Sequence, residues 1–165
     1  VFRGDSLVNV VCNIAKNRAY PDFNDDAKFN NLSQQTMEVL FKANAFPNQL
    51  NTLMGIEGHY LLRMGDAGVP SNQLQVATSS GNLTSTDLTF ESNKWYHVAV
   101  TFNRGNIKVY VNGEEKYAGN VSMSSVDLGA KHHNEEDGSR VFWIGYSYSS
   151  ARFFDGVVSE VRIWN

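Results

Sequence analysis

Aromatic and arginine side chains in two segments are the residues of this chain best suited to recognising a ligand. Aromatic rings offer flat apolar faces that pack against the C–H groups of a sugar, while a few fixed polar groups orient its hydroxyls. In the second segment, aromatic residues alternate with serines, a composition typical of adaptable recognition loops. The same residues also fit ordinary half-exposed positions of a β-sheet. The candidate ligand contacts are His59, Tyr60 and Arg63 in the first segment, and Tyr146, Tyr148, Arg152 and Phe153 in the second.

Composition argues against several other classes of partner. The net charge is −3 and the basic residues are scattered singly, so nothing concentrates the positive charge that nucleic acid binding needs. No apolar run approaches the roughly 18 residues that span a membrane, so we expect no membrane insertion by this segment. Cys12 is alone and forms no internal disulfide. Because the chain begins at Val1 without a signal peptide, we expect a larger parent protein and a targeting signal outside this sequence.

The segment 95–117 has the clearest pattern of local structure. Apolar residues alternate with other residues over 98–102 and again over 107–111, and this period of two is typical of β-strands. A turn at 103–106 separates the two runs. The dipeptide Asn112-Gly113 suits a type I′ hairpin, because both residues tolerate positive φ. The segment therefore predicts a three-stranded antiparallel meander.

Two further strands are expected near the end of the chain. The run 141–144 is apolar on both faces, which predicts a central strand covered on two sides. We expect all three tryptophans, Trp95, Trp143 and Trp164, in the core because they fall on well-defined strands. Strict alternation over the last strand places Val157, Ser159, Val161 and Ile163 on one face and Val158, Glu160, Arg162 and Trp164 on the other.

The first half of the chain carries fainter strand signals. Short runs at 50–56, 60–64 and 73–77 read as strands, and 8–14 reads as an outer strand followed by a long loop. The run 36–42 also fits helical spacing, but its β-branched and aromatic residues favour a strand. Many short antiparallel strands at intervals of about 8–12 residues predict an all-β sandwich or barrel, formed as one domain over 1–165.

Two motifs resemble the central and closing strands of laminin-G-like domains. The central motif is Trp95-Tyr96-His97-Val98-Ala99 with Tyr110-Val111-Asn112-Gly113, and the closing motif spans 154–165. The resemblance implies the concanavalin A-like lectin/glucanase superfamily and a jelly-roll β-sandwich of two curved antiparallel sheets. In overall character, the chain is also similar to C-terminal modules of Bacteroidetes surface lipoproteins linked to glycan uptake.

The resemblance extends to sandwich glycoside hydrolases of the laminarinase type, which carry carboxylates in a Glu-x-Asp-x-x-Glu strand pattern. Spacing by two puts such side chains on one face, where one attacks and another donates a proton. The nearest run here is 135–137, but Arg140 stands where the last Glu is needed, and Asn134 and Gly138 indicate a loop. We therefore expect no enzymatic activity.

Calcium is the ion that the resemblance implies. It takes about six to eight hard oxygen ligands, and Asp25, Asp26 and Asp155 carry suitable carboxylates. Ser159 stands where many relatives carry an acidic residue just before the closing Glu-Val-Arg, which weakens this expectation. The adjacent histidines 132–133 fit a loop better than a zinc site, because neighbouring loop histidines rarely face one ion.

Together these patterns predict a non-catalytic binding module of a cell-surface or secreted protein, with a glycan as its partner. In a bacterium, the resemblance would place the parent protein among outer-membrane lipoproteins. A protein–protein interaction module or a structural spacer remains the alternative, and it would expose an apolar patch of several hundred Å². A hydrolase is the third interpretation.

Overall fold

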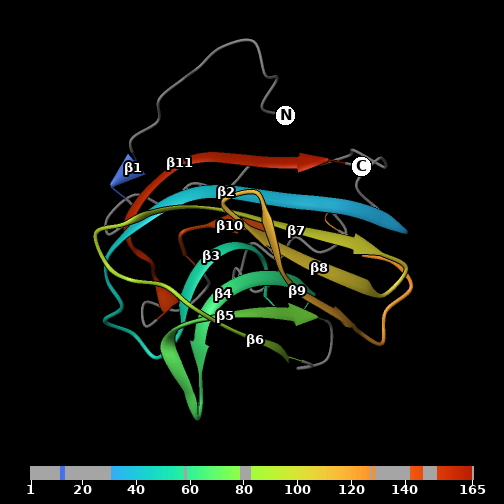
Figure 1. Ribbon diagram of the computed structural model, residues 1–165, viewed down its shortest axis with the longest axis horizontal. Coiled ribbons are helices and arrows are strands. Elements are labelled where there is room, and N and C mark those ends of the chain that lie inside the picture. Colours follow the sequence, from blue (N-terminus) through green and yellow to red (C-terminus); the bar gives the residue numbers. More distant parts are fainter. Residues whose placement is uncertain are drawn as a thin grey trace, which may run out of the picture.

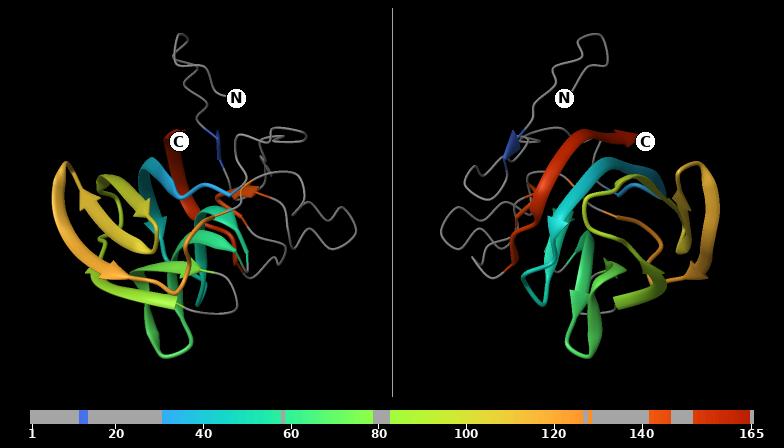
Figure 2. Two further views of the ribbon diagram at one scale, coloured as in Figure 1. Left: turned by 90° about the vertical axis from the view of Figure 1, so that its right-hand side faces the viewer. Right: turned by 60° about the vertical axis from the view of Figure 1, so that its left-hand side comes forward.

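The computed structural model describes residues 12–13, 31–57, 59–78, 83–126, 128, 142–146 and 152–164. These residues form two antiparallel sheets that pack face to face around one hydrophobic core (Figure 1). The predicted all-β jelly-roll sandwich is confirmed. The sheets are curved, and the long strands near the two ends of the described chain run side by side (Figure 2).

Eleven strands make up the described part of the sandwich. The six-stranded sheet has the order β1-β11-β2-β7-β8-β9, and the five-stranded sheet has the order β10-β3-β4-β5-β6. The strands are β1 Cys12–Asn13, β2 Gln34–Ala45, β3 Asn51–Ile56, β4 Tyr60–Asp66, β5 Val69–Thr78, β6 Leu83–Thr89, β7 Trp95–Asn103, β8 Asn106–Val111, β9 Glu114–Asn120, β10 Phe142–Ile144 and β11 Asp155–Trp164.

The predicted meander is confirmed as β7, β8 and β9. Asn112 and Gly113 connect β8 to β9 with φ of 52° and 84°, the two positive values that a type I′ turn requires. The Asn112 side chain also accepts a hydrogen bond of 2.9 Å from the His97 backbone N–H, which ties this hairpin back to β7. The segment 36–42 is likewise a strand, inside β2.

The core lies between the two sheets and takes alternate side chains from each strand. An aromatic group at one end of the sandwich surrounds Phe41, whose ring centroid lies 5.4 Å from Phe90, 5.9 Å from Tyr96 and 5.7 Å from Phe154. Phe41 is completely buried. This packing joins β2 to the segment that leads into β11.

The last strand does not follow the strict alternation that the sequence predicted. A β-bulge between Val158 and Glu160 inserts one extra residue opposite β2. Bulges shift the phase of all later side chains. Val158 therefore shares the core face with Val161 and Ile163, while Arg162 and Trp164 point outward.

None of the three tryptophans belongs to the core cluster between the sheets, contrary to the prediction, and two of them are exposed. Trp95 is 46% exposed and Trp164 is 56% exposed, because both occupy the outer face of the six-stranded sheet. Only Trp143 is buried, at 6%. Apolar character on a well-defined strand does not reveal which face a residue takes.

The edge strands β10 and β1 were predicted only in part. In the described part of the chain, β10 pairs with β3 alone and so stands at a sheet edge, although its three residues are buried on both faces. The predicted central position is therefore wrong, but the two-sided burial is right. The predicted outer strand at 8–14 is confirmed for 12–13, which pair with β11, and its other residues lie outside the described ranges.

Candidate functional site

The outer face of the five-stranded sheet carries a row of apolar positions. The residues that precede and follow this row along β4 and β10 belong to the core. Because successive side chains of a strand point to opposite faces, the residues of the row point away from the core. Gly55, at the middle of the row, has φ of +126°, and a Cβ there would lie 2.3 Å from the Tyr60 carbonyl oxygen. The indole of Trp143 meets the Tyr146 ring edge-on at 5.3 Å. In pairing order, this apolar row is Trp143, Gly55, Leu61 and Ala77.

A polar row lies beside the apolar row on the same face. Its members face one another across four strands, in the order Thr52, Arg63, Gln75 and Ser85. Gln75 Nε2 lies 3.3 Å from Ser85 Oγ, and Gln73 extends the row by donating to Ser85 at 2.6 Å and to Asp87 at 3.0 Å. The middle of this sheet face is therefore polar, although most of it is buried.

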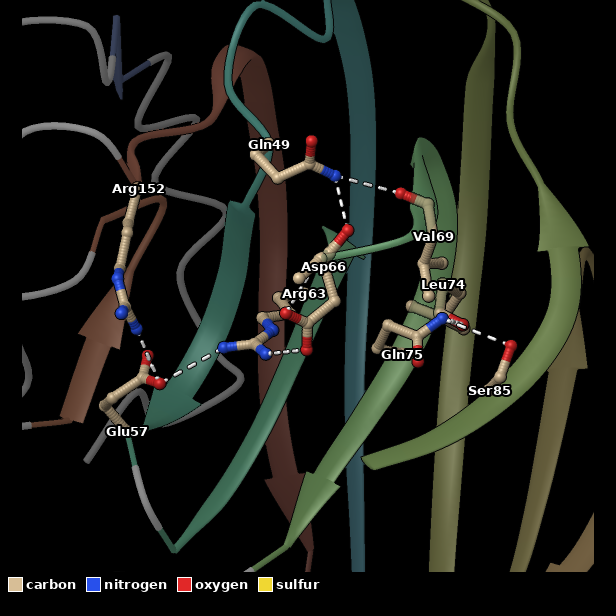
Figure 3. A network of polar contacts seen from close by, with 10 residues as sticks. Gln49, Glu57, Arg63, Asp66, Val69, Leu74, Gln75, Ser85 and Arg152 are labelled. Atoms are coloured by element: carbon tan, nitrogen blue, oxygen red, sulfur yellow. Dashed lines mark hydrogen bonds and ion pairs between the residues drawn. The ribbon is translucent and has the colours of Figure 1, made fainter. Parts of the chain in front are cut away.

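Arg63 is the centre of a charged cluster at one end of the polar row. Its side chain is only 7% exposed and lies between two carboxylates, with Nη1 3.2 Å from Glu57 Oε1 and Nη2 2.5 Å from Asp66 Oδ2 (Figure 3). From the other side, Arg152 Nη1 reaches the same Glu57 oxygen at 2.7 Å. We call Arg63, Glu57, Asp66 and Arg152 the Arg63 cluster.

Three separate segments build the Arg63 cluster. Arg63 and Asp66 come from β4, Glu57 from the turn between β3 and β4, and Arg152 from the segment that leads into β11. The β4–β5 turn is closed by Gln49, whose Nε2 donates to the Asp66 and Val69 carbonyls (Figure 3). Asp66 Oδ1 also accepts from the Ala67 N–H, so the hairpin fixes its carboxylate.

Two buried polar atoms at this site have no hydrogen-bond partner among the residues that the structure describes. They are Arg63 Nε and Thr52 Oγ1, which belong to directly paired positions on β4 and β3. A buried polar group without a partner is uncommon in a folded protein, and functional sites are one place where such groups occur.

The structure brings most of the predicted ligand contacts to this end of the sheet. Arg63 and Arg152 share Glu57, and Tyr146 packs on Trp143. The Gly145 carbonyl accepts from the Phe154 N–H, so the segments of Tyr146 and of Arg152–Phe153 lie side by side.

For two of the predicted ligand contacts, Phe153 and His59, the structure describes hydrogen bonds of the backbone. The Phe153 carbonyl accepts from Asn48 Nδ2 at 2.9 Å, and its side chain is half-buried. His59 lies in the turn that also carries Glu57, where its N–H donates to the Ile56 carbonyl. Sequence reasoning missed Glu57, Asp66 and Trp143 as members of the site, because only strand pairing shows that they share a face with Arg63.

Tyr60 is not accessible to a ligand. Its side chain is completely buried in the core, with the ring 5.9 Å from Phe102, and its burial raises the pKa of the phenol well above the ordinary value. The strand alternation that turns Arg63 outward turns Tyr60 inward. We therefore leave Tyr60 out of the site.

Tyr60→Phe is expected to stabilise the domain by about 1 kcal/mol, because the buried Tyr60 hydroxyl has no partner among the described residues. Urea unfolding followed by tryptophan fluorescence measures the change. Tyr96→Phe is the matched control: the Tyr96 hydroxyl accepts from the Glu91 N–H at 3.2 Å, so its loss should be neutral or slightly destabilising. A loss of stability in Tyr60→Phe would show that the hydroxyl is hydrogen-bonded.

The calcium prediction remains untested. Asp155 Oδ1 accepts a hydrogen bond from Asn44 Nδ2 at 3.1 Å, and within the described ranges no group of three His, Cys, Asp or Glu side chains gathers. Asp25, Asp26 and Tyr148 lie outside the described residues, as do the histidines 132–133 and the acidic run 135–137. No helix in the described part of the chain is long and apolar enough to cross a bilayer.

Comparison with known protein families identifies the superfamily of this domain. The family model for the concanavalin A-like lectin/glucanases superfamily matches residues 16–165. The chain belongs to that superfamily. A candidate carbohydrate binding protein from Bacteroides ovatus is 32% identical, with a TM-score of 0.67 over 89% of this chain. The match covers 40% of the Bacteroides chain, so the superfamily domain described here spans two fifths of that relative.

Two more distant structures share the fold alone. Domain 4 of AbnA, a GH43 extracellular arabinanase from Geobacillus stearothermophilus in complex with arabinotriose, is 23% identical, with a TM-score of 0.58 over 79% of this chain and 60% of its own. A heptameric SAP-like pentraxin from Limulus polyphemus is 16% identical, with a TM-score of 0.58 over 89% and 74%. No curated protein matches the chain.

Proposed function

We propose that this lectin-like domain is a non-catalytic carbohydrate-binding module. The observation that carries the proposal is the meeting of an aromatic pair and a cluster of fixed charges on one sheet face. Trp143 lies opposite Gly55 on β3, and Glu57 follows two residues later in the turn at the end of that strand. Aromatic rings beside oriented polar groups form the chemistry that recognises sugars.

The likeness to other proteins supports the same class of ligand. The Bacteroides relative is a candidate carbohydrate binding protein, and the AbnA domain of the same fold is in complex with arabinotriose. A module that retains polysaccharide works on extracellular material, so we also propose a cell-surface or secreted parent protein.

The arrangement of carboxylates favours binding over catalysis. Glu57 and Asp66 are two carboxylates on one face, as a glycosidase requires. The Arg63 guanidinium lies directly between them and contacts both, so it fills the space where a scissile sugar linkage would have to lie (Figure 3). This pair is therefore built to hold an arginine.

Tyr146→Ala and Arg152→Ala are each expected to weaken retention on the polysaccharide that binds the unmodified domain by about tenfold or more. Affinity electrophoresis through gels containing arabinan, galactan, xylan, mannan or β-glucan measures retention. Both side chains are partly exposed, so the melting temperature should fall by no more than about 3 °C. Tyr148→Ala is expected to act in the same way.

Trp164→Ser is the matched control, since it removes an aromatic side chain from the opposite sheet and should leave retention unchanged. If the unmodified domain binds no glycan in a broad panel, the proposal is wrong.

A second candidate function, protein docking, is favoured by the exposed Trp95 and Trp164 on the six-stranded sheet. Exposed tryptophans are frequent anchors of protein interfaces. Under this alternative, Trp164→Ser would abolish binding to a partner protein, whereas Tyr146→Ala would not.

A further inference from the structure

The turn between β8 and β9 contains Asn112-Gly113, the single Asn-Gly pair in the chain. Both residues are exposed, and a Cβ built on Gly113 would meet no described atom within 4 Å. Solvent therefore reaches the pair freely. We propose that Asn112 is a site of covalent modification, where the side-chain amide is lost as ammonia, and that the native turn blocks this reaction until the hairpin tip opens. The proposal is independent of glycan binding.

The reaction needs only the two residues and water. The backbone nitrogen of Gly113 bonds to the Asn112 Cγ, the bond from Cγ to Nδ2 breaks, and the proton of the attacking nitrogen leaves with Nδ2 as ammonia. Water then opens the resulting five-membered succinimide. Attack at Cγ gives aspartate, and attack at the main-chain carbonyl carbon gives isoaspartate. Glycine favours ring closure because no side chain limits its backbone.

The backbone conformation of Asn112 keeps its side chain away from the Gly113 nitrogen. The ring can form only when Cβ and the following nitrogen lie on the same side of the Cα–C bond. Asn112 has φ of 52°. In this left-handed region ψ is about +30 to +60°, which places Cβ and the following nitrogen on nearly opposite sides of that bond. Asn112 must therefore leave the type I′ turn before the ring can close.

Two hydrogen bonds add to this restraint by tying Asn112 to β7. Its N–H donates to the His97 carbonyl at 2.8 Å, and its Oδ1 accepts from the His97 N–H at 2.9 Å. The Gly113 nitrogen leads the chain into β9 instead. Because the side-chain carbonyl that this nitrogen attacks is bonded to β7, the side-chain bond must break as well.

Opening of the hairpin tip therefore sets the rate in the folded domain. When the tip closes faster than the ring forms, the observed rate is the rate of the unfolded chain multiplied by the fraction of time that the tip is open. Two hydrogen bonds of ordinary net strength make the folded domain react at least about tenfold more slowly than the unfolded chain.

The modification makes a transient opening permanent. Aspartate keeps an oxygen that can accept from the His97 N–H, so this product can refold into the same turn. Isoaspartate continues the chain through Cγ and adds one carbon atom to the main chain of a two-residue loop. Because loop length fixes the register of a hairpin, we expect this product to lose the pairing of Val111 with Glu114.

Peptide mapping by mass spectrometry over time measures the reaction. Replacement of the side-chain NH2 by OH changes the mass, and chromatography separates isoaspartate from aspartate. The folded domain, the urea-unfolded domain and a synthetic peptide of residues 109–116, with and without urea, are compared in one mildly alkaline buffer. We expect the peptide and the unfolded domain to react at similar rates, and the folded domain at least about tenfold more slowly.

Val111→Ala tests whether the hairpin itself restrains Asn112. Val111 directly precedes Asn112 and packs against the core, so its truncation should open the tip more often and speed the reaction of the folded domain several-fold. Val161→Ala is the matched control, because it removes the same groups from a partly buried valine on β11 and should leave the rate unchanged. Circular dichroism checks that both variants are folded.

Three results would overturn the proposal. Equal rates in the folded domain and the peptide would show that the turn does not block the reaction. Absence of modification in the peptide and in the unfolded domain would show that Asn112 is no modification site. Equal acceleration by Val111→Ala and Val161→Ala would show that the restraint does not lie in the hairpin.

Discussion

Arg63→Ala is expected to destabilise the domain by about 3–5 kcal/mol, the usual cost of removing one partner from a buried ion pair. Glu57 would keep Arg152, but Asp66 would lose the guanidinium that lies 2.5 Å from its carboxylate. Domains of this kind are stable by only about 5–15 kcal/mol, so the loss would be a large share of the total. Urea unfolding at neutral pH, followed by tryptophan fluorescence, measures it.

Two controls separate lost charge pairing from lost packing. Arg63→Met with Asp66→Asn removes both charges while keeping side-chain volume, and it should recover at least half of the lost stability. Lys94→Ala breaks the exposed pair with Glu91 and should leave the unfolding midpoint nearly unchanged. If Arg63→Ala is as mild as Lys94→Ala, then Arg63 does not hold the β3–β4 and β4–β5 turns in place.

Those parts of the fold that depend on neighbours in sequence were predictable. The β7–β9 meander follows from alternating residues and from Asn112-Gly113, a turn whose positive φ values are local properties of two residues. Register and bulges depend on distant partners. At Val157-Val158 both residues are apolar and β-branched, so the sequence alone does not reveal the phase shift that the bulge opposite β2 introduces.

The strands themselves could be predicted, but it was harder to predict which of their residues are exposed. Trp95 and Trp164 fit a strand in either orientation, and both point outward because their partners on β2, Lys42 and Thr36, do so too. Lys42 Nζ lies 5.5 Å from the Trp95 ring centroid, and Trp164 Nε1 donates to Glu38. Polar partners of this kind make an exposed tryptophan tolerable, and they are invisible until the strands are paired.

The same limit applies to the candidate site. Residue type was enough to select Arg63, Arg152 and Tyr146, but it also selected Tyr60, which faces the core. Glu57, which joins the two arginines, carries no signal of its own in the sequence. Its role arises because the turn after β3 brings Glu57 into contact both with Arg63 on β4 and with Arg152 in the segment before β11.

Phe41→Ala is expected to destabilise the domain by about 3–5 kcal/mol, because it removes a completely buried ring that touches three others. Phe41→Leu keeps most of the volume and should cost less than half as much. Trp164→Ala removes a larger ring from the exposed face and should cost little by comparison. Urea unfolding of the three variants under one set of conditions gives the ranking.

Phe41→Ala should also disturb the candidate binding site. Phe154 packs 5.7 Å from Phe41 and donates its N–H to the Gly145 carbonyl, so the core ring helps to fix the segment that carries Arg152 beside Tyr146. Under conditions where Phe41→Ala is still folded, we expect it to weaken glycan retention, although Phe41 lies too deep to touch a ligand. Unchanged retention in a folded but strongly destabilised Phe41→Ala variant would show that the Arg152 segment is positioned without the core.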